Sequence, residues 1–133
     1  GRIADGNTVL DYDGEEKKRR ASVSTAVAPL EWNGIKMNLV DTPGLFDFAG
    51  GVSEGIRAAD CVLITTAAGC KYDVGAEKAD ARGIAKMFAI TKVDAENTDF
   101  YKTLDFLKEV HETQLCPIVV PYMEGGVVQP RAP

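Results

Sequence analysis

Residues 41–44 read Asp-Thr-Pro-Gly and directly follow the apolar end of the run 38–40. An aspartate at the end of a strand can reach Mg²⁺ directly or through a water, because this hard cation prefers oxygen ligands. A glycine two residues after the threonine lets the backbone N–H approach a terminal phosphate, since no Cβ stands in the way. The same residues, Asp41, Thr42, Pro43 and Gly44, also suit a simple turn with glycine in the left-handed region. Both interpretations stay open for this motif alone.

A second motif, Thr91-Lys92-Val93-Asp94, follows the aliphatic run 87–90. The Asp94 carboxylate can accept two parallel hydrogen bonds from the N1–H and the exocyclic amine of guanine, and adenine lacks that donor pair. The Lys92 stem can lie along the base while its charge stays hydrated. Alternatively, Thr91 or Asp94 only caps the next helix. Because each motif follows its own aliphatic run, their order and spacing favour a nucleotide site over chance turns and caps.

The elements that must position these motifs can be predicted from local patterns. Asn33-Gly34 lies between two alternating runs and predicts a hairpin, because both central residues of such a turn need positive φ. The short aliphatic runs 61–64, 87–90 and 118–120 predict strands that are covered on both faces. Helices are predicted at 52–59, 76–82 and 99–110. The last of these has an apolar stripe that includes Phe100, Leu104, Leu107 and Val110.

Strands that alternate with helices predict an α/β fold with a mostly parallel sheet, to which the hairpin adds an antiparallel edge. Ligands bind beyond the carboxyl ends of the strands in such a sheet, where both motifs stand. Residues 1–28 are expected to be a mobile segment, with the charge run 15–20 forming at most a short solvated helix. Residues 29–124 are expected to be the partial binding domain and 125–133 a trailing linker.

Composition narrows the possible partners. The 133 residues, 45% of them hydrophobic, suit one domain. Fifteen basic against 20 acidic residues leave a net charge of -5, so the chain has no basic patch for nucleic acid. Its apolar runs are far shorter than the roughly 20 residues that span a bilayer. The three widely spaced cysteines form no CxxC pair and are expected to be buried or free thiols in a reducing cytoplasm.

Residues 41–48, Asp-Thr-Pro-Gly-Leu-Phe-Asp-Phe, resemble the Asp-Thr-Pro-Gly-His-Val-Asp-Phe signature of translational GTPases. Residues 50–60 and 67–69 look like the following helix and strand of elongation factor G. Residues 91–94 resemble the Asn-Lys-Met-Asp guanine motif of the family, and residues 6–13 resemble the start of switch I in elongation factor G-like proteins. The resemblance covers about residues 1–120 and implies a P-loop GTPase-like fold that is incomplete at its N-terminus.

The resemblance implies GTP or GDP with Mg²⁺ as ligands and the ribosome as partner. Asp41 would be the magnesium-linked aspartate, and Gly44 would sense the γ-phosphate. The family's switch I ends in Arg-Gly-Ile-Thr, so Ser22, in Arg-Arg-Ala-Ser, would be a second magnesium ligand, with Ser24 and Thr25 as weaker candidates. The residues expected at the nucleotide are Asp41, Thr42, Pro43, Gly44, Thr91, Lys92 and Asp94.

Three departures from the family pattern bear on activity. Leu45 stands where the family has the histidine that orients the attacking water, and an aliphatic group cannot transfer a proton. The phosphate loop Gly-x-x-x-x-Gly-Lys-Ser/Thr does not occur in the 133 residues, and it is expected before Gly1. The crossover 71–82 is short for a parallel connection, so residues are expected to be missing between Lys78 and Ala81.

Three functions follow as hypotheses. The first is a GTP-binding domain fragment of a ribosomal translocation factor, in which GTP hydrolysis drives translation elongation and which alone is inactive. The second is a GTP-dependent binding switch of the same fold with slow or lost hydrolysis, as Leu45 suggests. The third is an α/β domain that binds no nucleotide and carries both motifs by accident.

Overall fold

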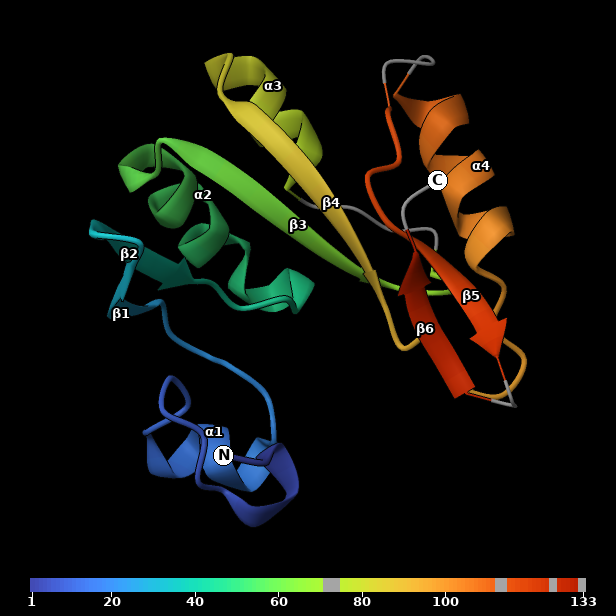
Figure 1. Ribbon diagram of the computed structural model, residues 1–133. Helices are drawn as coiled ribbons and strands as arrows, with labels where there is room; N and C mark the ends of the chain where they lie inside the picture. The colour runs from blue at the N-terminus through green and yellow to red at the C-terminus, as the bar shows by residue number, and fades with distance from the viewer. Residues whose placement is uncertain (71–74, 112–114, 125–126, 132–133) are drawn as a thin grey trace. The chain divides into compact units, whose positions relative to one another are not determined.

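The computed structural model describes residues 1–70, 75–111, 115–124 and 127–131 (Figure 1). They form two compact units, residues 1–62 with 74–86, and residues 63–73 with 87–133. The elements in chain order are η1 (Ile3–Asp5), α1 (Gly14–Arg19), β1 (Ala26–Trp32), β2 (Ile35–Asp41), η2 (Phe46–Phe48), α2 (Ala49–Ala58), β3 (Cys61–Ala67), α3 (Ala76–Arg82), β4 (Ala85–Thr91), α4 (Phe100–Val110), β5 (Val120–Glu124) and β6 (Val127–Arg131).

The predicted hairpin is confirmed as the antiparallel pair of β1 and β2, which runs from Trp32↔Ile35 at the turn to Ala26↔Asp41 at the far end. Asn33 and Gly34 make the turn with φ of 53° and 75°. Positive φ at both positions matches the twist of the two strands, which is why Asn-Gly suits this place. The hairpin is hydrogen-bonded as a two-stranded sheet of its own in the described residues. Its register fixes the position of Asp41 at the end of β2.

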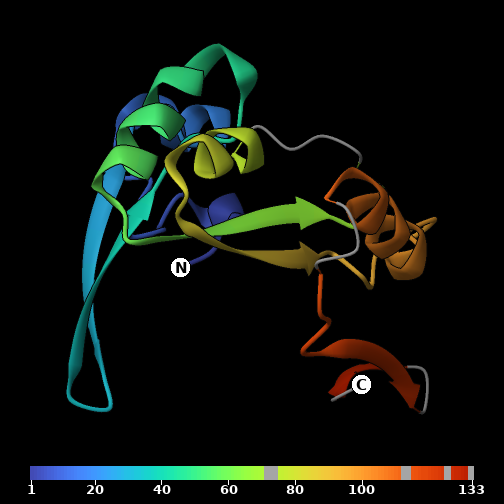
Figure 2. The same ribbon diagram turned by 90° about the horizontal axis from the view of Figure 1, so that it is seen from above.

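Strands β3 and β4 form the parallel pair that the aliphatic runs 61–64 and 87–90 predict, and both arrows point the same way in Figure 1 and Figure 2. The expectation that these strands are covered on both faces is wrong. Ile64 is buried, but Leu63 and Met87 are 59% and 58% exposed. Successive side chains of a strand point to opposite faces, so packing reaches one face of the pair and leaves the other open.

The helices agree closely with their predicted ranges. Helix α3 matches residues 76–82, and at seven residues it is as short as the sequence suggests. Its backbone is continuous through Lys78 and Ala81, while residues 71–74 lie outside the described part of the chain. Helix α2 begins three residues earlier than predicted. In α4 the predicted stripe buries Leu107, but Val110 at its end is 52% exposed.

The C-terminal part of the sequence prediction is wrong in one respect. A strand was expected at 118–120, but β5 begins only at Val120, and Ile118 and Val119 are 68% and 56% exposed. Strand β5 pairs antiparallel with β6, which lies within the segment predicted to be a linker. Gly-Gly at 125–126 between two runs with β-branched residues is a hairpin signal, and it outweighs the prolines that suggested a linker. The predicted division at residues 28 and 124 stays a prediction.

Two further expectations concern the surface. Helix α1 forms within the charge run, but this run is not a uniformly solvated face, because Glu16 is buried. Cys61, Cys70 and Cys116 are free thiols and exposed. Among the described residues, the helices are too short or too polar to cross a membrane.

Candidate functional site

The first motif lies where β2 ends and the chain turns toward α2. Asp41 and Thr42 are half-buried, and Pro43 is fully buried, which fixes the start of the loop. Gly44 and Leu45 follow at the surface, and Leu45 is 49% exposed. The motif is therefore held by its first three residues, while Gly44 and the following Leu45 are exposed and can meet a ligand.

Neither the backbone conformation nor the packing requires a glycine at position 44. Its φ lies outside the left-handed region, and a Cβ built on it would meet nothing within 4 Å. The interpretation of residues 41–44 as a turn that needs glycine in the left-handed region is therefore wrong. A glycine that neither conformation nor packing demands leaves its N–H open to close approach from outside the chain.

Two glycines of α2 allow the helix to lie directly on the first motif. A Cβ on Gly55 would come within 2.4 Å of Thr42 Cγ2, and a Cβ on Gly51 within 2.9 Å of Thr25 Oγ1 and 3.0 Å of Pro43 Cδ. Thr25 also donates a hydrogen bond to the Gly51 carbonyl at 3.4 Å. The two glycines, four apart, share one face of the helix, and their small size sets how closely the loop is held.

Gly55→Ala should therefore destabilise the chain by about 1–3 kcal/mol, because the new methyl group meets a β-branched side chain that has little freedom to move. Gly50→Ala is the matched control in the same helix. A Cβ on Gly50 would meet nothing within 4 Å, so we expect a neutral effect or stabilisation by up to about 1 kcal/mol. Urea unfolding of the two variants measures the difference. Equal stabilities would show that α2 does not rest on Thr42.

Asp41 lies in an acidic neighbourhood. Burial raises the pKa of its carboxyl group, the charges of Asp11 and Glu16 raise it further, and the Thr42 backbone N–H opposes them. Asp11 in turn accepts hydrogen bonds from the hydroxyl groups of Ser22 at 2.7 Å and Thr8 at 3.2 Å. A divalent cation would relieve the repulsion between these carboxylates, so the oxygen donors present suit Mg²⁺.

Ser22 remains able to act as a metal ligand. Its hydroxyl donates its proton to Asp11, which leaves the oxygen lone pairs for a cation. In the described residues no hydrogen bond joins Ser22 to Asp41, and no three acidic, histidine or cysteine side chains converge as a complete metal cage. Mg²⁺ commonly needs only one or two protein oxygens when waters and phosphates complete its shell. The N-terminal unit thus offers a partial set of donors of the right chemistry.

A depression of about 310 Å³ opens beside Asp41 in the same unit. Only Asp41 among its lining residues was predicted as a site residue. The depression is lined by Gly1, Ile3, Thr8, Val9, Leu10, Asp11 and Asp41. The sequence alone does not indicate Asp11, because its partners Thr8 and Ser22 come from the two sides of α1.

The second motif lies in the other unit, at the end of β4. The Thr91 hydroxyl donates to the Thr66 carbonyl at 3.2 Å, and Lys92 follows with a left-handed φ of 53°. The interpretation of Thr91 or Asp94 as a helix cap is wrong, because Asp99 caps α4 by accepting from the Lys102 N–H at 3.1 Å. Asp94 is exposed and accepts no hydrogen bond from another described residue. Its carboxylate is therefore available to a ligand.

Thr103 of α4 forms hydrogen bonds that stabilise the surroundings of this motif. Its buried hydroxyl accepts from the Gly69 N–H at 2.8 Å and donates to the Asp99 carbonyl at 3.1 Å. The neighbouring Ala68 N–H donates to the Thr91 carbonyl at 2.9 Å. The loop after β3, the end of β4 and the first turn of α4 are thereby joined. A left-handed non-glycine residue such as Lys92 is strained by roughly 1–2 kcal/mol, and such strain persists where the surroundings fix the backbone.

A family model described as "Elongation factor Tu GTP binding domain" matches residues 1–124. An elongation factor G-like protein of Mycobacterium tuberculosis is 35% identical over 129 residues, which are 94% of this chain and 18% of that protein. A mitochondrial ribosome-releasing factor 2 of Drosophila willistoni is 30% identical over 126 residues, 92% of this chain and 17% of that protein.

A solved structure is also similar. A crystal structure of a protein from Thermus thermophilus superposes with a TM-score of 0.86 at 36% identity, and the match covers 96% of this chain and 20% of that one. The chain therefore spans less than about a quarter of the length of the relatives that it matches.

Proposed function

Because this chain belongs to the elongation factor Tu GTP-binding domain family, we propose that it binds guanine nucleotide as part of a translation factor. The predicted fold class, an α/β fold of the P-loop GTPase type, is confirmed by the family match and by the Thermus thermophilus structure. The observation that supports binding most directly is Gly44, a glycine that neither its φ nor its packing requires. In the proposal its N–H meets the terminal phosphate.

Each site residue has a part in the proposal. The exposed carboxylate of Asp94 accepts the two guanine donors, and Lys92 lies along the base. Asp41 and Ser22 would hold Mg²⁺, and Asp11 orients the Ser22 hydroxyl through the 2.7 Å hydrogen bond. Mg²⁺ held there would supply positive charge that offsets the negative charge of the phosphates. Thr42 and Pro43, held against α2, set the position of Gly44.

We propose further that the full-length protein hydrolyses GTP on the ribosome in the cytoplasm. The relatives named elongation factor G-like protein and ribosome-releasing factor 2 support a ribosomal partner, and the second of them is named mitochondrial. A second function, a GTP-dependent binding switch with slow or lost hydrolysis, is favoured by one observation. Leu45 places a half-exposed aliphatic side chain beside Gly44, where an acid or base would be needed to handle the attacking water.

Competition between nucleotides tests the proposal. In the full-length protein GDP should displace a fluorescent GDP analogue and ADP should not, because adenine lacks the donor pair for Asp94. The 133-residue chain alone should bind GTP weakly or not at all, since its sequence contains no phosphate loop. Equal displacement by ADP would rule out the guanine site. A submicromolar GTP affinity of the 133-residue chain, measured by calorimetry, would show that a phosphate loop is not needed.

A further inference from the structure

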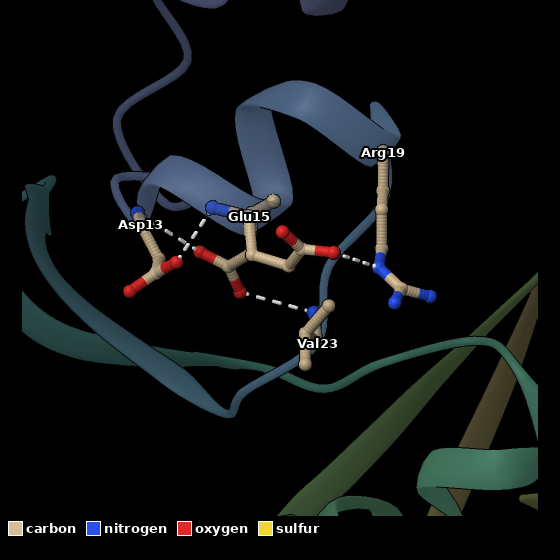
Figure 3. Close-up of polar contacts among 5 residues, drawn as sticks. Asp13, Glu15, Arg19 and Val23 are labelled. Atoms are coloured by element: carbon tan, nitrogen blue, oxygen red, sulfur yellow. Dashed lines mark hydrogen bonds and ion pairs between the residues drawn. The ribbon is translucent and has the colours of Figure 1, made fainter.

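A buried carboxylate joins the helix and the loop on either side of the candidate ligand Ser22. Glu16 lies in α1 and is only 2% exposed. Its Oε2 accepts from the Asp13 N–H at 3.2 Å, and its Oε1 accepts from the Val23 and Ser24 N–H groups at 3.0 and 3.1 Å. Dashed lines in Figure 3 run from the labelled Asp13 and Val23 to the carboxylate drawn between them, which carries no label of its own and is that of Glu16. The name Glu16 clasp is used below for these three hydrogen bonds.

Of the three hydrogen bonds in the Glu16 clasp, only the one from the Asp13 N–H to Oε2 belongs to the N-terminal cap of α1. Asp13 and Glu16 form a capping box, in which Glu16 Oε2 satisfies the Asp13 N–H and the Asp13 side chain satisfies amides of the first turn. Oε1 has no part in this exchange. It leaves the helix and satisfies two successive amides of the loop that follows, so this oxygen has a separate role.

The hydrogen bonds also favour the charged form of Glu16. The Val23 and Ser24 N–H groups lower the pKa of Glu16, burial opposes them, and the Asp13 N–H adds to the lowering. A shielded carboxylate keeps its charge when several N–H groups donate to it. Neighbouring Glu15 differs, because it is exposed and pairs only at the surface with Arg19.

We propose that Glu16 is a positioning residue, whose clasp holds the loop 22–24 so that the Ser22 hydroxyl can meet Mg²⁺ and the γ-phosphate of GTP. Ser22 lies immediately before the two clasped amides, and its own hydroxyl is oriented by Asp11. Beyond the loop, Thr25 bonds to Gly51 of α2, so the chain is fixed on both sides of Ser24. This role rests on the proposed function, since it concerns GTP more than GDP.

Hydrogen exchange tests the clasp without any nucleotide. The Val23 and Ser24 amides should exchange about tenfold faster in Glu16→Gln, because a neutral side-chain amide accepts more weakly than a carboxylate and has one acceptor oxygen for three N–H groups. Glu16→Ala loses both carboxylate oxygens, so the Val23 and Ser24 amides should exchange faster still in this variant. Glu15→Gln is the matched control and should leave both amides unchanged. The hairpin amides of β1 and β2 report whether each variant remains folded. Unchanged exchange at Val23 and Ser24 in Glu16→Ala would overturn the clasp.

Nucleotide binding by the full-length protein separates positioning from simple capping. With Mg²⁺ present, Glu16→Gln should bind a slowly hydrolysed GTP analogue about tenfold more weakly, while its GDP affinity stays within about twofold. Glu15→Gln should change neither affinity. Faster exchange combined with equal losses for both nucleotides would overturn the positioning role and leave Glu16 as a structural residue. Wild-type protein that binds no guanine nucleotide would overturn the proposed function, and the exchange result would still decide whether Glu16 holds the loop.

Discussion

Leu45→His should raise the rate of GTP hydrolysis by the full-length protein. A positioned acid or base contributes about 10²- to 10⁴-fold to a rate, and the wild-type leucine can neither donate nor accept a proton. Leu45 is exposed and follows Gly44 directly, so a polar side chain there can reach water beside the proposed phosphate position. Single-turnover kinetics with saturating ribosomes measures the effect, and nucleotide affinity should change little.

Leu45→Met is the matched control for this substitution, because it conserves volume and has no proton to transfer. Its rate should equal that of the wild type. A wild-type rate that matches relatives with histidine would mean that another group, such as one from the ribosome, aligns the water. If Leu45→His leaves the rate of GTP hydrolysis unchanged, the geometry of the loop does not let a histidine at this position reach the attacking water. Either result would mean that Leu45 does not decide between a GTP-hydrolysing enzyme and a binding switch with slow or lost hydrolysis.

Asp94→Ala should weaken GDP binding by the full-length protein about ten- to a hundredfold, because the base donors lose a charged partner worth about 1.5–3 kcal/mol. Asp94→Asn should shift preference toward xanthosine diphosphate, since an amide can donate to the oxygen that replaces the exocyclic amine. Asp105→Asn, an exposed carboxylate on α4, is the control and should change neither affinity. A GDP titration in which Asp94→Ala equals the wild type would place the base elsewhere.

Local patterns predicted the elements well because their causes are local. The Asn33-Gly34 turn needs only two residues that accept positive φ, and α3 ends at Gly83, whose φ of 65° stops the helix. The failure at Ile118 and Val119 has the opposite cause. An aliphatic run becomes a strand only if it finds a pairing partner, and here the partner, β6, lies opposite the residues that begin at Val120.

The site was predicted where the sequence itself carries the chemistry, as at Gly44 and Asp94, although their roles stay predictions. Asp11, Glu16 and Thr103 were missed because each acts on residues that become neighbours only after folding. Glu16 reaches Val23 and Ser24 past the end of its helix, and Thr103 reaches Gly69 from 34 positions away. Charge runs and threonines are common in solvated helices, so the residue types of Glu16 and Thr103 alone do not indicate a role in the site.

The hairpin of β1 and β2 has a consequence for the order in which the chain folds. All its pairs are close in sequence, from Trp32↔Ile35 outward to Ala26↔Asp41, and hairpins of this kind close in about 1–10 μs. The parallel pairing of β3 with β4 must wait for the crossover that contains α3, which is slower because a longer loop has to close. A lone hairpin is at best marginally stable, so we expect it to open and close repeatedly until α2 packs against the end of β2, where Gly55 lies beside Val40 and Thr42. We therefore expect Gly55, whose small size lets α2 approach Thr42, also to control when the hairpin becomes stably folded.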